Sequence, residues 1–406
     1  MRKLISLAVI LMLSLLAAQP VAAAPSASAA DKSTKVIKLK IGSPVISING
    51  KNQPLDLEGT VPVIENGITF VPVRAIFEAL SADVRWNGET QTVSGIRGNL
   101  AVHLRVGSKI AYRNDEVLRL DTPPQIINGR TMVPVRFVAE SMGADIKWDS
   151  KTQTVIITET KKFITLDNST VYMEDTLAQV ESILGKAKRI DPSHYDFEWH
   201  VYNENYSKFI MVGIKNGIVE AIYSNTKGFV TNNAKYGDTT VNMERGVTLY
   251  TDQFDNSKIH ACLIISDNVV PETLGSDFFR AQELENFDVT NVFRVNYGLK
   301  PLAYDGTATA AARKHSQDMA NKDYFAHINL EGLTPGERFK STGGIYKGYG
   351  ENIAAGDLLG INAFDGWVNS ENHRSNILVS RQYMGVGHGY NAASTYKFYL
   401  TQFLYY

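Results

Sequence analysis

The chain has 406 residues, 44% of them hydrophobic, and its 41 Lys and Arg nearly balance 42 Asp and Glu. This length predicts two or three domains, and this composition is ordinary for chains that bury real cores. The formal net charge of -1 excludes the basic field that nucleic-acid binding needs, and no polybasic run predicts contact with an anionic membrane surface.

The N-terminus has the pattern of a secretory signal peptide. Two positively charged residues precede an apolar run over 4–18, and Ala-rich sequence follows it. The run is shorter than the roughly 20 apolar residues that span a bilayer, so cleavage is favoured over a membrane anchor. Ala23 and Ala30 end two candidate cleavage sites. We expect a signal peptide over 1–23, a linker over 24–35 and no transmembrane anchor after cleavage.

An internal repeat follows the linker. The sequence TFVPVRAIFEALSADVRWNGETQTV over 69–93 matches TMVPVRFVAESMGADIKWDSKTQTV over 131–155. Each copy is typical of hairpin strands, a short helix and another strand. Asn-Gly pairs predict tight turns between the apolar runs. A Pro directly before each predicted helix, at 74–80 and 136–142, suits a helix N-terminus.

Trp86 and Trp148 hold equivalent positions in the two copies. They could stack on sugars, but repetition at one position favours a core role, so we expect both side chains to be shielded. The VPVR, G/S-A-D-x-x-W and T-Q-T-V elements make residues 36–159 resemble the copper amine oxidase-like N-terminal domain of exported bacterial proteins. The resemblance implies a stalk module and not the oxidase. A copper site needs clustered histidines, and His103 stands alone in this region, so no copper is expected.

A central segment over 160–280 is typical of an α+β domain. Thr176 and Gln179 have capping-box spacing before a helical pattern, and an Asn-Gly pair predicts a hairpin. Cys262 is the only cysteine, which excludes an internal disulfide, and we expect it to be a small buried hydrophobe. With LGKAKRIDPSHYDFEWHVYN and MVGIKNG, this segment resembles the associated domain that precedes many bacterial CAP domains.

The C-terminal segment over 281–406 has the patterns of several helices and a final hairpin. Asp305 predicts the cap of one helix. Thr334 and Glu337 have capping-box spacing at the start of another. The last strand carries apolar side chains on both of its faces, which predicts a sheet covered by helices on each side.

The same segment carries, in this order, NVFRVNYGLKPLAYD, AARKHSQDMANKDYFAH, GENIAAG, WVNSENHRSNIL and GVGHGY. With these motifs it resembles the CAP superfamily of cysteine-rich secretory proteins, antigen 5 and pathogenesis-related proteins, also called SCP-like. The resemblance implies an α-β-α sandwich with a cleft. The expected fold class is therefore multidomain α+β: a β-rich two-copy repeat with short helices, a central α+β domain and a C-terminal CAP sandwich.

The resemblance also implies a cleft that holds two His and two Glu from separate segments. His327 of YFAH, Glu351 of GEN and His373 of NHR match three of these positions. The fourth, a Glu three residues after the Trp in eukaryotic members, is Ser370 here, with Glu371 as its neighbour. We expect these five residues to line one cleft, with each imidazole within hydrogen-bond or shared-ion reach of Glu351 and with Ser370 or Glu371 at the rim. We assign no catalytic residue among them.

Two imidazoles and a carboxylate leave three chemistries open. His327, His373 and Glu351 could hold a divalent cation such as Zn²⁺ with an open position. A His–Glu pair could act as acid and base on a bound water. Alternatively, the groups could close a hydrogen-bonded network that fixes the loops or holds a ligand. The sequence has no H-E-x-x-H motif, no G-x-S-x-G elbow and no reactive cysteine, which favours the network.

We interpret the chain as an exported modular protein, either secreted or non-covalently attached to the cell surface. Its CAP domain is predicted to be a binding or structural module of the cell envelope, with wall glycan, peptide or lipid as candidate ligands. The alternative is a metal-dependent or acid/base hydrolase of peptide or cell-wall glycan. The presence of Ser370 and the missing catalytic motifs favour the binding module.

Overall fold

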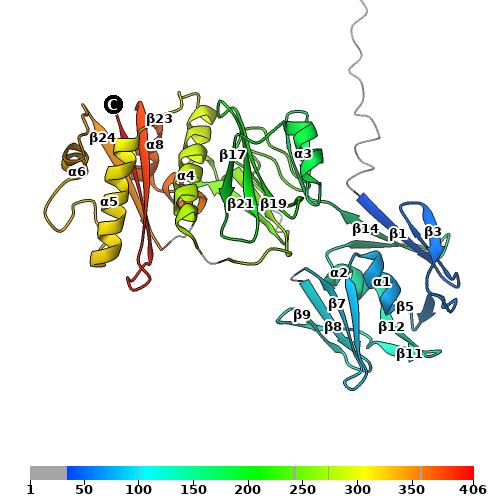
Figure 1. Ribbon diagram of the computed structural model, residues 1–406. Helices are drawn as coiled ribbons and strands as arrows, with labels where there is room; N and C mark the ends of the chain where they lie inside the picture. Colours follow the sequence, from blue (N-terminus) through cyan, green and yellow to red (C-terminus); the bar gives the residue numbers. More distant parts are fainter. Residues whose placement is uncertain (1–33, 99, 241–243, 273, 357–358) are drawn as a thin grey trace, which may run out of the picture.

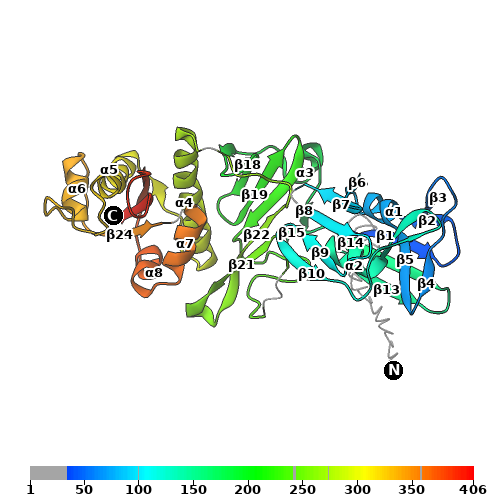
Figure 2. The same ribbon diagram turned by 90° about the horizontal axis from the view of Figure 1, so that it is seen from below.

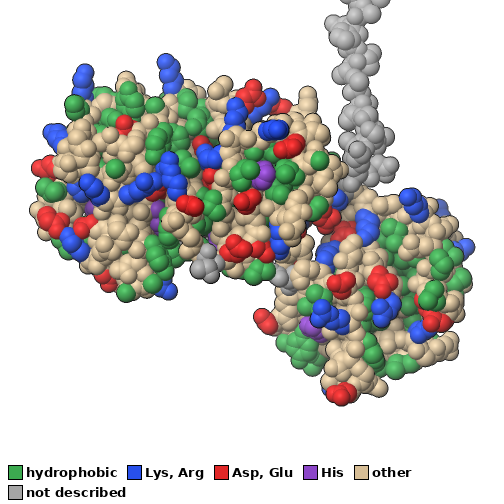
Figure 3. Space-filling view, viewed as in Figure 1, with side chains coloured by type: hydrophobic (Ala, Val, Ile, Leu, Met, Phe, Trp, Pro, Cys, Tyr) green, Lys and Arg blue, Asp and Glu red, His purple; other side chains and the backbone are tan. Residues whose placement is uncertain are grey.

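The structure is a computed structural model that describes residues 34–98, 100–240, 244–272, 274–356 and 359–406 (Figure 1). The predicted signal peptide, its cleavage sites and nearly all of the linker lie outside the described residues. Within the described ranges, no helix is both long enough and apolar enough to cross a membrane. Acidic and basic side chains are interspersed over the face seen in Figure 3, in agreement with the balanced composition.

The N-terminal repeat unit is rich in short strands, as predicted. Its helices and strands are β1 (Thr34–Lys40), β2 (Val45–Ile48), β3 (Lys51–Pro54), β4 (Val63–Glu65), β5 (Ile68–Pro72), α1 (Val73–Ala79), β6 (Asp83–Asn87), β7 (Thr92–Arg97), β8 (Leu100–Arg105), β9 (Ile110–Arg113), β10 (Glu116–Arg119), β11 (Gln125–Ile127), β12 (Arg130–Pro134), α2 (Val135–Ser141), β13 (Asp145–Asp149) and β14 (Thr154–Thr160). The predicted helices thus begin directly after Pro72 and Pro134. The Asn and Gly of both predicted turns have positive φ, which confirms these turns.

The two copies of the repeat are intertwined. One outer sheet has the order β13-β14-β1-β2-β3, so it joins the first strands of copy one to the last strands of copy two. The other outer sheet, β10-β9-β8-β7-β6, joins the last strands of copy one to the first strands of copy two. The middle sheet, β11-β12-β5-β4, also takes strands from both copies. One hydrophobic core, with α1 and α2 at its centre, fills the unit. A single copy would therefore leave each outer sheet incomplete.

The prediction that both repeat tryptophans are shielded is wrong. Trp86 is 46% exposed and Trp148 is 41% exposed. They lie on β6 and β13, which are edge strands of their sheets. On these strands Val84 and Ile146 pack against the core. The two tryptophans are not part of this core, so an equivalent position in both copies is here an equivalent surface position.

The central segment consists of a hairpin, a short helix and a six-stranded sheet in the order β17-β18-β19-β20-β22-β21. Its elements are β15 (Phe163–Leu166), β16 (Ser169–Tyr172), α3 (Leu177–Leu184), β17 (Arg189–Pro192), β18 (Glu198–Glu204), β19 (Lys208–Lys215), β20 (Ile218–Ser224), β21 (Val247–Asp252), the 3-10 helix η1 (Gln253–Asp255) and β22 (Lys258–Ile265). The capping box of Thr176 and Gln179 is confirmed at the start of α3. Cys262 is fully buried, and burial raises the pKa of its thiol to about 12.

The C-terminal segment is a sheet in the order β23-β25-β26-β24 between helices. Its elements are α4 (Ser276–Asn296), β23 (Ala303–Tyr304), α5 (Gly306–Lys322), α6 (Pro335–Ser341), β24 (Tyr349–Ala355), α7 (Gly360–Val368), α8 (Glu371–Leu378), β25 (Tyr383–Tyr390) and β26 (Phe398–Tyr405). The caps predicted at Asp305 and at Thr334 with Glu337 are confirmed. Helices α4 and α5 cover opposite faces of the sheet (Figure 1), which confirms the predicted sandwich.

The motif GVGHGY explains how the two helices fit onto β25. A Cβ added at Gly385, Gly387 or Gly389 would meet the backbone of α5, so the glycines allow that helix to approach closely. Side chains alternate along a strand. The intervening residues, Val386 and His388, therefore face the other side, where α4 lies.

Helix α4 lies between the central sheet and the C-terminal sheet (Figure 2). One hydrophobic core contains side chains from both sheets, including Trp199 and Phe209 of the central one and Met384 and Leu404 of the C-terminal one. The central and C-terminal segments therefore share a core.

Candidate functional site

The centre of the predicted site is a buried carboxylate with two partners. Glu351 lies on β24, and its side chain is 4% exposed. Its Oε1 lies 2.9 Å from Nδ1 of His327, and its Oε2 accepts a 2.6 Å hydrogen bond from Nη2 of Arg338. Arg338, on α6, also donates to the backbone carbonyls of His327 and Leu333. The guanidinium thus holds both the carboxylate and the loop that carries the imidazole.

His373 reaches the site from α8, which is separated from the end of α7 by two residues. Its Nδ1 lies 2.9 Å from Oγ of Ser370, the N-cap residue of α8. Burial lowers the pKa of His373, and the charge of His327 lowers it further. The structure therefore brings the two imidazoles near each other, but His373 makes its hydrogen bond to Ser370 and not to Glu351. Glu371 is exposed in the first turn of α8, where a carboxylate stabilises the helix N-terminus.

A chain of buried amides lies behind the cluster. Asn376 of α8 donates to Oδ1 of Asn352 at 2.9 Å, and Asn352 donates to Oε1 of Gln402 at 3.0 Å. Gln402 in turn donates to Oδ1 of Asn286 at 3.1 Å and to Oγ1 of Thr290 at 2.9 Å. These bonds connect α8, β24, β26 and α4. They hold the strand that carries Glu351 against the helix that carries His373.

Arg338 is the site residue that the sequence analysis missed. It is 8% exposed, and it supplies the positive charge that a buried carboxylate needs. The capping box at Thr334 places the start of α6, and Arg338 lies one turn into that helix. The position of Arg338 in this helix could have indicated its role, because a buried Glu351 requires a cation from a nearby element. The spacing alone did not distinguish Arg338 from the other basic residues.

The opposite side of the α7–α8 stretch contacts the central segment. Nη1 of Arg374 lies 2.9 Å from Oδ2 of Asp252, and their side chains are 11% and 3% exposed. The hydroxyl of Tyr297 donates to the same oxygen at 3.0 Å. Oδ1 of Asn369 accepts a 2.9 Å bond from the backbone N–H of Gln253. The motif WVNSENHRSNIL is thus a joint, with one side at the His–Glu cluster and the other at the central sheet.

The cluster fits a divalent cation poorly in this arrangement. Both oxygens of Glu351 are engaged, and the Arg338 guanidinium in contact with them would repel a cation. Across the described ranges, no group of three or more His, Cys, Asp or Glu is placed to hold a metal ion. Cation binding by His327, His373 and Glu351 would require the carboxylate to exchange Arg338 for the ion, and it stays a prediction.

Replacing His373 with Ala is expected to lower the free energy of unfolding by about 1 kcal/mol, the usual effect of losing one hydrogen bond. Its imidazole is half-buried and bonded to the Ser370 hydroxyl. Urea unfolding of the full-length protein measures the change. Ser370→Ala removes the same bond, so the double variant should cost less than the sum of the two single changes. Strict additivity would contradict a direct bond.

Three family models match the chain in the predicted order. Residues 57–157 match the copper amine oxidase N-terminal domain, residues 173–261 match the CAP-associated N-terminal domain, and residues 287–404 match the cysteine-rich secretory protein family. The three predicted resemblances are therefore confirmed.

Among curated relatives, the uncharacterized membrane protein YlbC of Bacillus subtilis (strain 168) is 27% identical over 266 residues, which are 52% of this chain and 77% of that protein. The uncharacterized protein YkwD of the same organism is 42% identical over 110 residues, 27% of this chain and 42% of that protein. A protease inhibitor of Brevibacillus choshinensis is 31% identical over 86 residues, 21% of this chain and 26% of the inhibitor. This chain therefore spans less than half of the last two proteins.

A crystal structure of an extracellular protein containing an SCP domain, from Bacillus anthracis str. Ames, matches 57% of this chain and 93% of its own. The two share 24% sequence identity, and the TM-score is 0.50. This similarity shows a shared fold.

Proposed function

We propose that this protein, whose C-terminal segment belongs to the cysteine-rich secretory protein (CAP) family, is an exported binding module of the cell envelope. Its signal-peptide pattern supports export. The solved relative from Bacillus anthracis is described as extracellular, which agrees with this placement. The ligand is held at the cluster of His327, Glu351, Arg338, His373 and Ser370, and the intertwined repeat unit serves as the stalk.

The observation that carries this proposal is the complete pairing of Glu351. A general base must accept a proton from substrate or water, whereas both oxygens of this carboxylate are already bonded to His327 and Arg338. The His327 side chain is 49% exposed, and its Nδ1 is held by Glu351. Its Nε2 edge is therefore oriented and accessible, which suits hydrogen bonding to a ligand.

The expected ligand is wall glycan. Imidazole edges and hydroxyls exchange neutral hydrogen bonds well with sugar hydroxyl and acetamido groups. The near-neutral charge of the whole chain provides no electrostatic attraction for a strongly charged polymer. Peptide and lipid are the competing candidate ligands.

The test measures binding of soluble wall glycan fragments to the full-length protein by calorimetry. His327→Ala and His373→Ala should each weaken binding by about tenfold, the effect of losing a hydrogen bond in a desolvated site. Lys347→Ala, which changes an exposed residue outside the cluster, is the matched control and should bind as the parent does. Unchanged affinity in both His variants would overturn the assignment of the cluster. Loss of binding on addition of a chelator would instead support the cation prediction.

A second function is favoured by one feature of the same cluster. The His327 imidazole is oriented by a buried carboxylate, which is how an imidazole base is often held in hydrolases. An acid/base hydrolase would release new ends from wall glycan or peptide during incubation with the protein, and His327→Ala would abolish this release. Binding without any new ends would leave the binding module as the function.

A further inference from the structure

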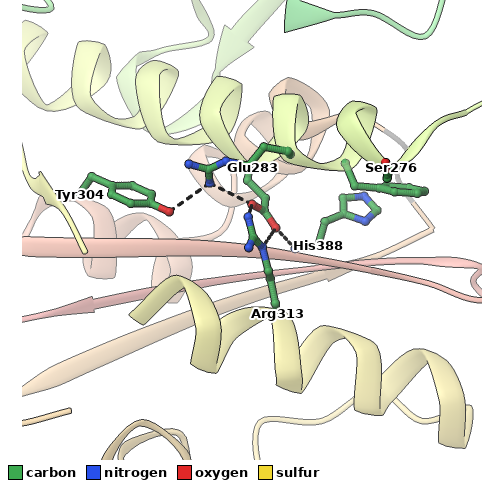
Figure 4. A pocket seen from close by; sticks show the side chains of 7 residues that line it. Ser276, Glu283, Tyr304, Arg313 and His388 are labelled. Atoms are coloured by element: carbon green, nitrogen blue, oxygen red, sulfur yellow. Dashed lines mark hydrogen bonds and ion pairs between the residues drawn. The ribbon is translucent and has the colours of Figure 1, made fainter. Parts of the chain in front are cut away.

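A separate pocket of about 510 Å³ opens on the C-terminal sheet, where the first turns of α4 face β25, β23 and α5. Figure 4 shows the side chains that line it, which are Ser276, Phe279, Arg280, Glu283, Tyr304, Arg313 and His388. None of them belongs to the His327–Glu351 cluster. The alternation of β25 accounts for the position of His388, because the glycines on either side of it face α5.

The pocket carries a net positive charge. Glu283 is 3% exposed, and its Oε1 accepts bonds from Nε of Arg313 at 2.6 Å and from the backbone N–H of His388 at 3.0 Å. Nη1 of Arg280 lies 3.2 Å from Oε2 of Glu283 and donates to the hydroxyl of Tyr304 at 3.0 Å. Two guanidinium groups thus face one carboxylate. Each has five N–H donors, so both keep donors for a ligand.

The N-terminus of α4 adds to this positive field. The helix has 21 residues, and Ser276, its first residue, lines the pocket. The first N–H groups of a helix lack partners within it and carry partial positive charge. The guanidinium side chains of Arg280 and Arg313 are 40% and 45% exposed, so solvent and ligands reach them.

The ring nitrogens of His388 are not well satisfied by the fold. The residue is 7% exposed, and neither ring nitrogen makes a hydrogen bond of good geometry, although the backbone of Gly389 interacts with the ring. Its ring packs against Phe279 with the centroids 4.8 Å apart. Burial lowers the pKa of His388 to about 4, so the ring is neutral near pH 7 and offers one donor and one acceptor. Leaving such groups buried and unpaired is unfavourable, which indicates that a ligand completes them.

We propose that this pocket binds a carboxylate-bearing organic ligand. Its carboxylate lies between Arg280 and Arg313, its body lies against the aromatic ring of Phe279, and His388 forms a hydrogen bond with it. Two cationic side chains and one anionic side chain leave a single positive charge, which matches a monoanionic carboxylate better than a phosphate dianion. The proposal does not depend on the function of the His327–Glu351 cluster.

Calorimetry on the full-length protein with two acid–amide pairs tests the proposal. The pairs are benzoate with benzamide, and N-acetyl-alanyl-alanine with its C-terminal amide. In at least one pair the acid should bind about tenfold more tightly than the neutral amide, because only the acid makes charge-assisted hydrogen bonds. Selectivity confined to the peptide pair would identify a peptide terminus as the source, and selectivity confined to benzoate would identify a free organic acid. Equal binding within both pairs, or tighter binding of inorganic phosphate, would overturn the proposal.

Two variants separate a ligand site from a structural feature. Arg280→Gln should weaken binding of the acid about tenfold, while Arg313 still pairs with Glu283. Lys314→Gln is the matched control, since it removes one positive charge from an exposed α5 residue that does not line the pocket and should leave the affinity unchanged. His388→Phe keeps the ring packing and removes both unpaired nitrogens. It should weaken binding while the midpoint of urea unfolding stays equal or rises. A lower midpoint with unchanged affinity would show that His388 is structural and would overturn its assigned role.

Discussion

Replacing Arg374 with Ala is expected to lower the free energy of unfolding by about 3–5 kcal/mol, the usual effect of breaking a buried ion pair from one side. The change leaves Asp252 with its side chain 3% exposed and without its cation. It also removes a guanidinium that lies over the rings of Phe293 and Tyr297, at 5.1 and 5.2 Å from their centroids. Urea unfolding of the full-length protein measures this change.

The control for Arg374 is an exposed pair of the same chemistry. Arg74 and Glu78 form an ion pair on α1 with side chains 63% and 57% exposed. Arg74→Ala should change stability by no more than about 0.5 kcal/mol. Because Arg374 connects α8 to the central sheet, its loss should also separate the unfolding of the central and C-terminal segments. A change as small as that of Arg74→Ala would contradict a stabilising role for the ion pair that Arg374 forms between α8 and the central sheet.

Acidification from pH 6.5 to pH 4 is expected to destabilise the C-terminal segment through two buried histidines. His315 is 1% exposed and His388 is 7% exposed, and burial lowers the pKa of each from 6.5 to about 4. Within this window the unfolded chain binds protons that the folded chain does not. The stability contributed by the neutral rings is therefore complete above pH 6.5 and is lost as the pH falls toward 4. The shifts correspond to about 3 kcal/mol for each histidine.

The difference between the parent protein and His388→Phe isolates one of these contributions. Burial raises the pKa of Glu285 and Asp288, so their protonation stabilises the folded state as the pH falls. This opposite pH dependence of stability is present in both the parent and His388→Phe, so it cancels when the two proteins are compared. Unfolding curves in urea at several pH values should show the parent losing about 3 kcal/mol more than the variant between pH 6.5 and pH 4. Parallel pH profiles would contradict a neutral, buried His388.

Much of the local structure could be predicted because its causes lie within a few residues. The capping boxes at Thr176 and Thr334 and the cap at Asp305 form from side chains that bond to N–H groups in the next turn. The Asn-Gly turns follow from the positive φ that these residues tolerate. The last strand, apolar on both faces, predicted a sheet with helices on each side, and β26 is buried along nearly its whole length.

The candidate site was predictable in part. The motifs that place His327 and Glu351 were sufficient to predict two residues that the structure brings into contact. The structure gives His373 a hydrogen bond to Ser370 and not the predicted one to Glu351, because the choice between these partners depends on how α8 is turned. Arg338 was missed for a similar reason. Many basic residues lie nearby in sequence, and only the folded chain shows which guanidinium is buried with the carboxylate.

Other features were decided by tertiary structure alone. Helix α4 buries Gln282, Glu285, Asn286 and Asp288, because it lies between two sheets and both of its sides are covered. A helix covered on all sides has no single apolar stripe, so periodicity does not reveal its surroundings.

The repeat also combines features that its sequence determined with features that only the tertiary structure decided. Its sequence determined two equivalent sets of strands, turns and helices, since each depends on neighbours along the chain. Trp86 and Trp148 lie on edge strands, where both are exposed. Burial depends on what packs against a strand, and β6 and β13 each pair with only one neighbouring strand, which the sequence pattern does not reveal.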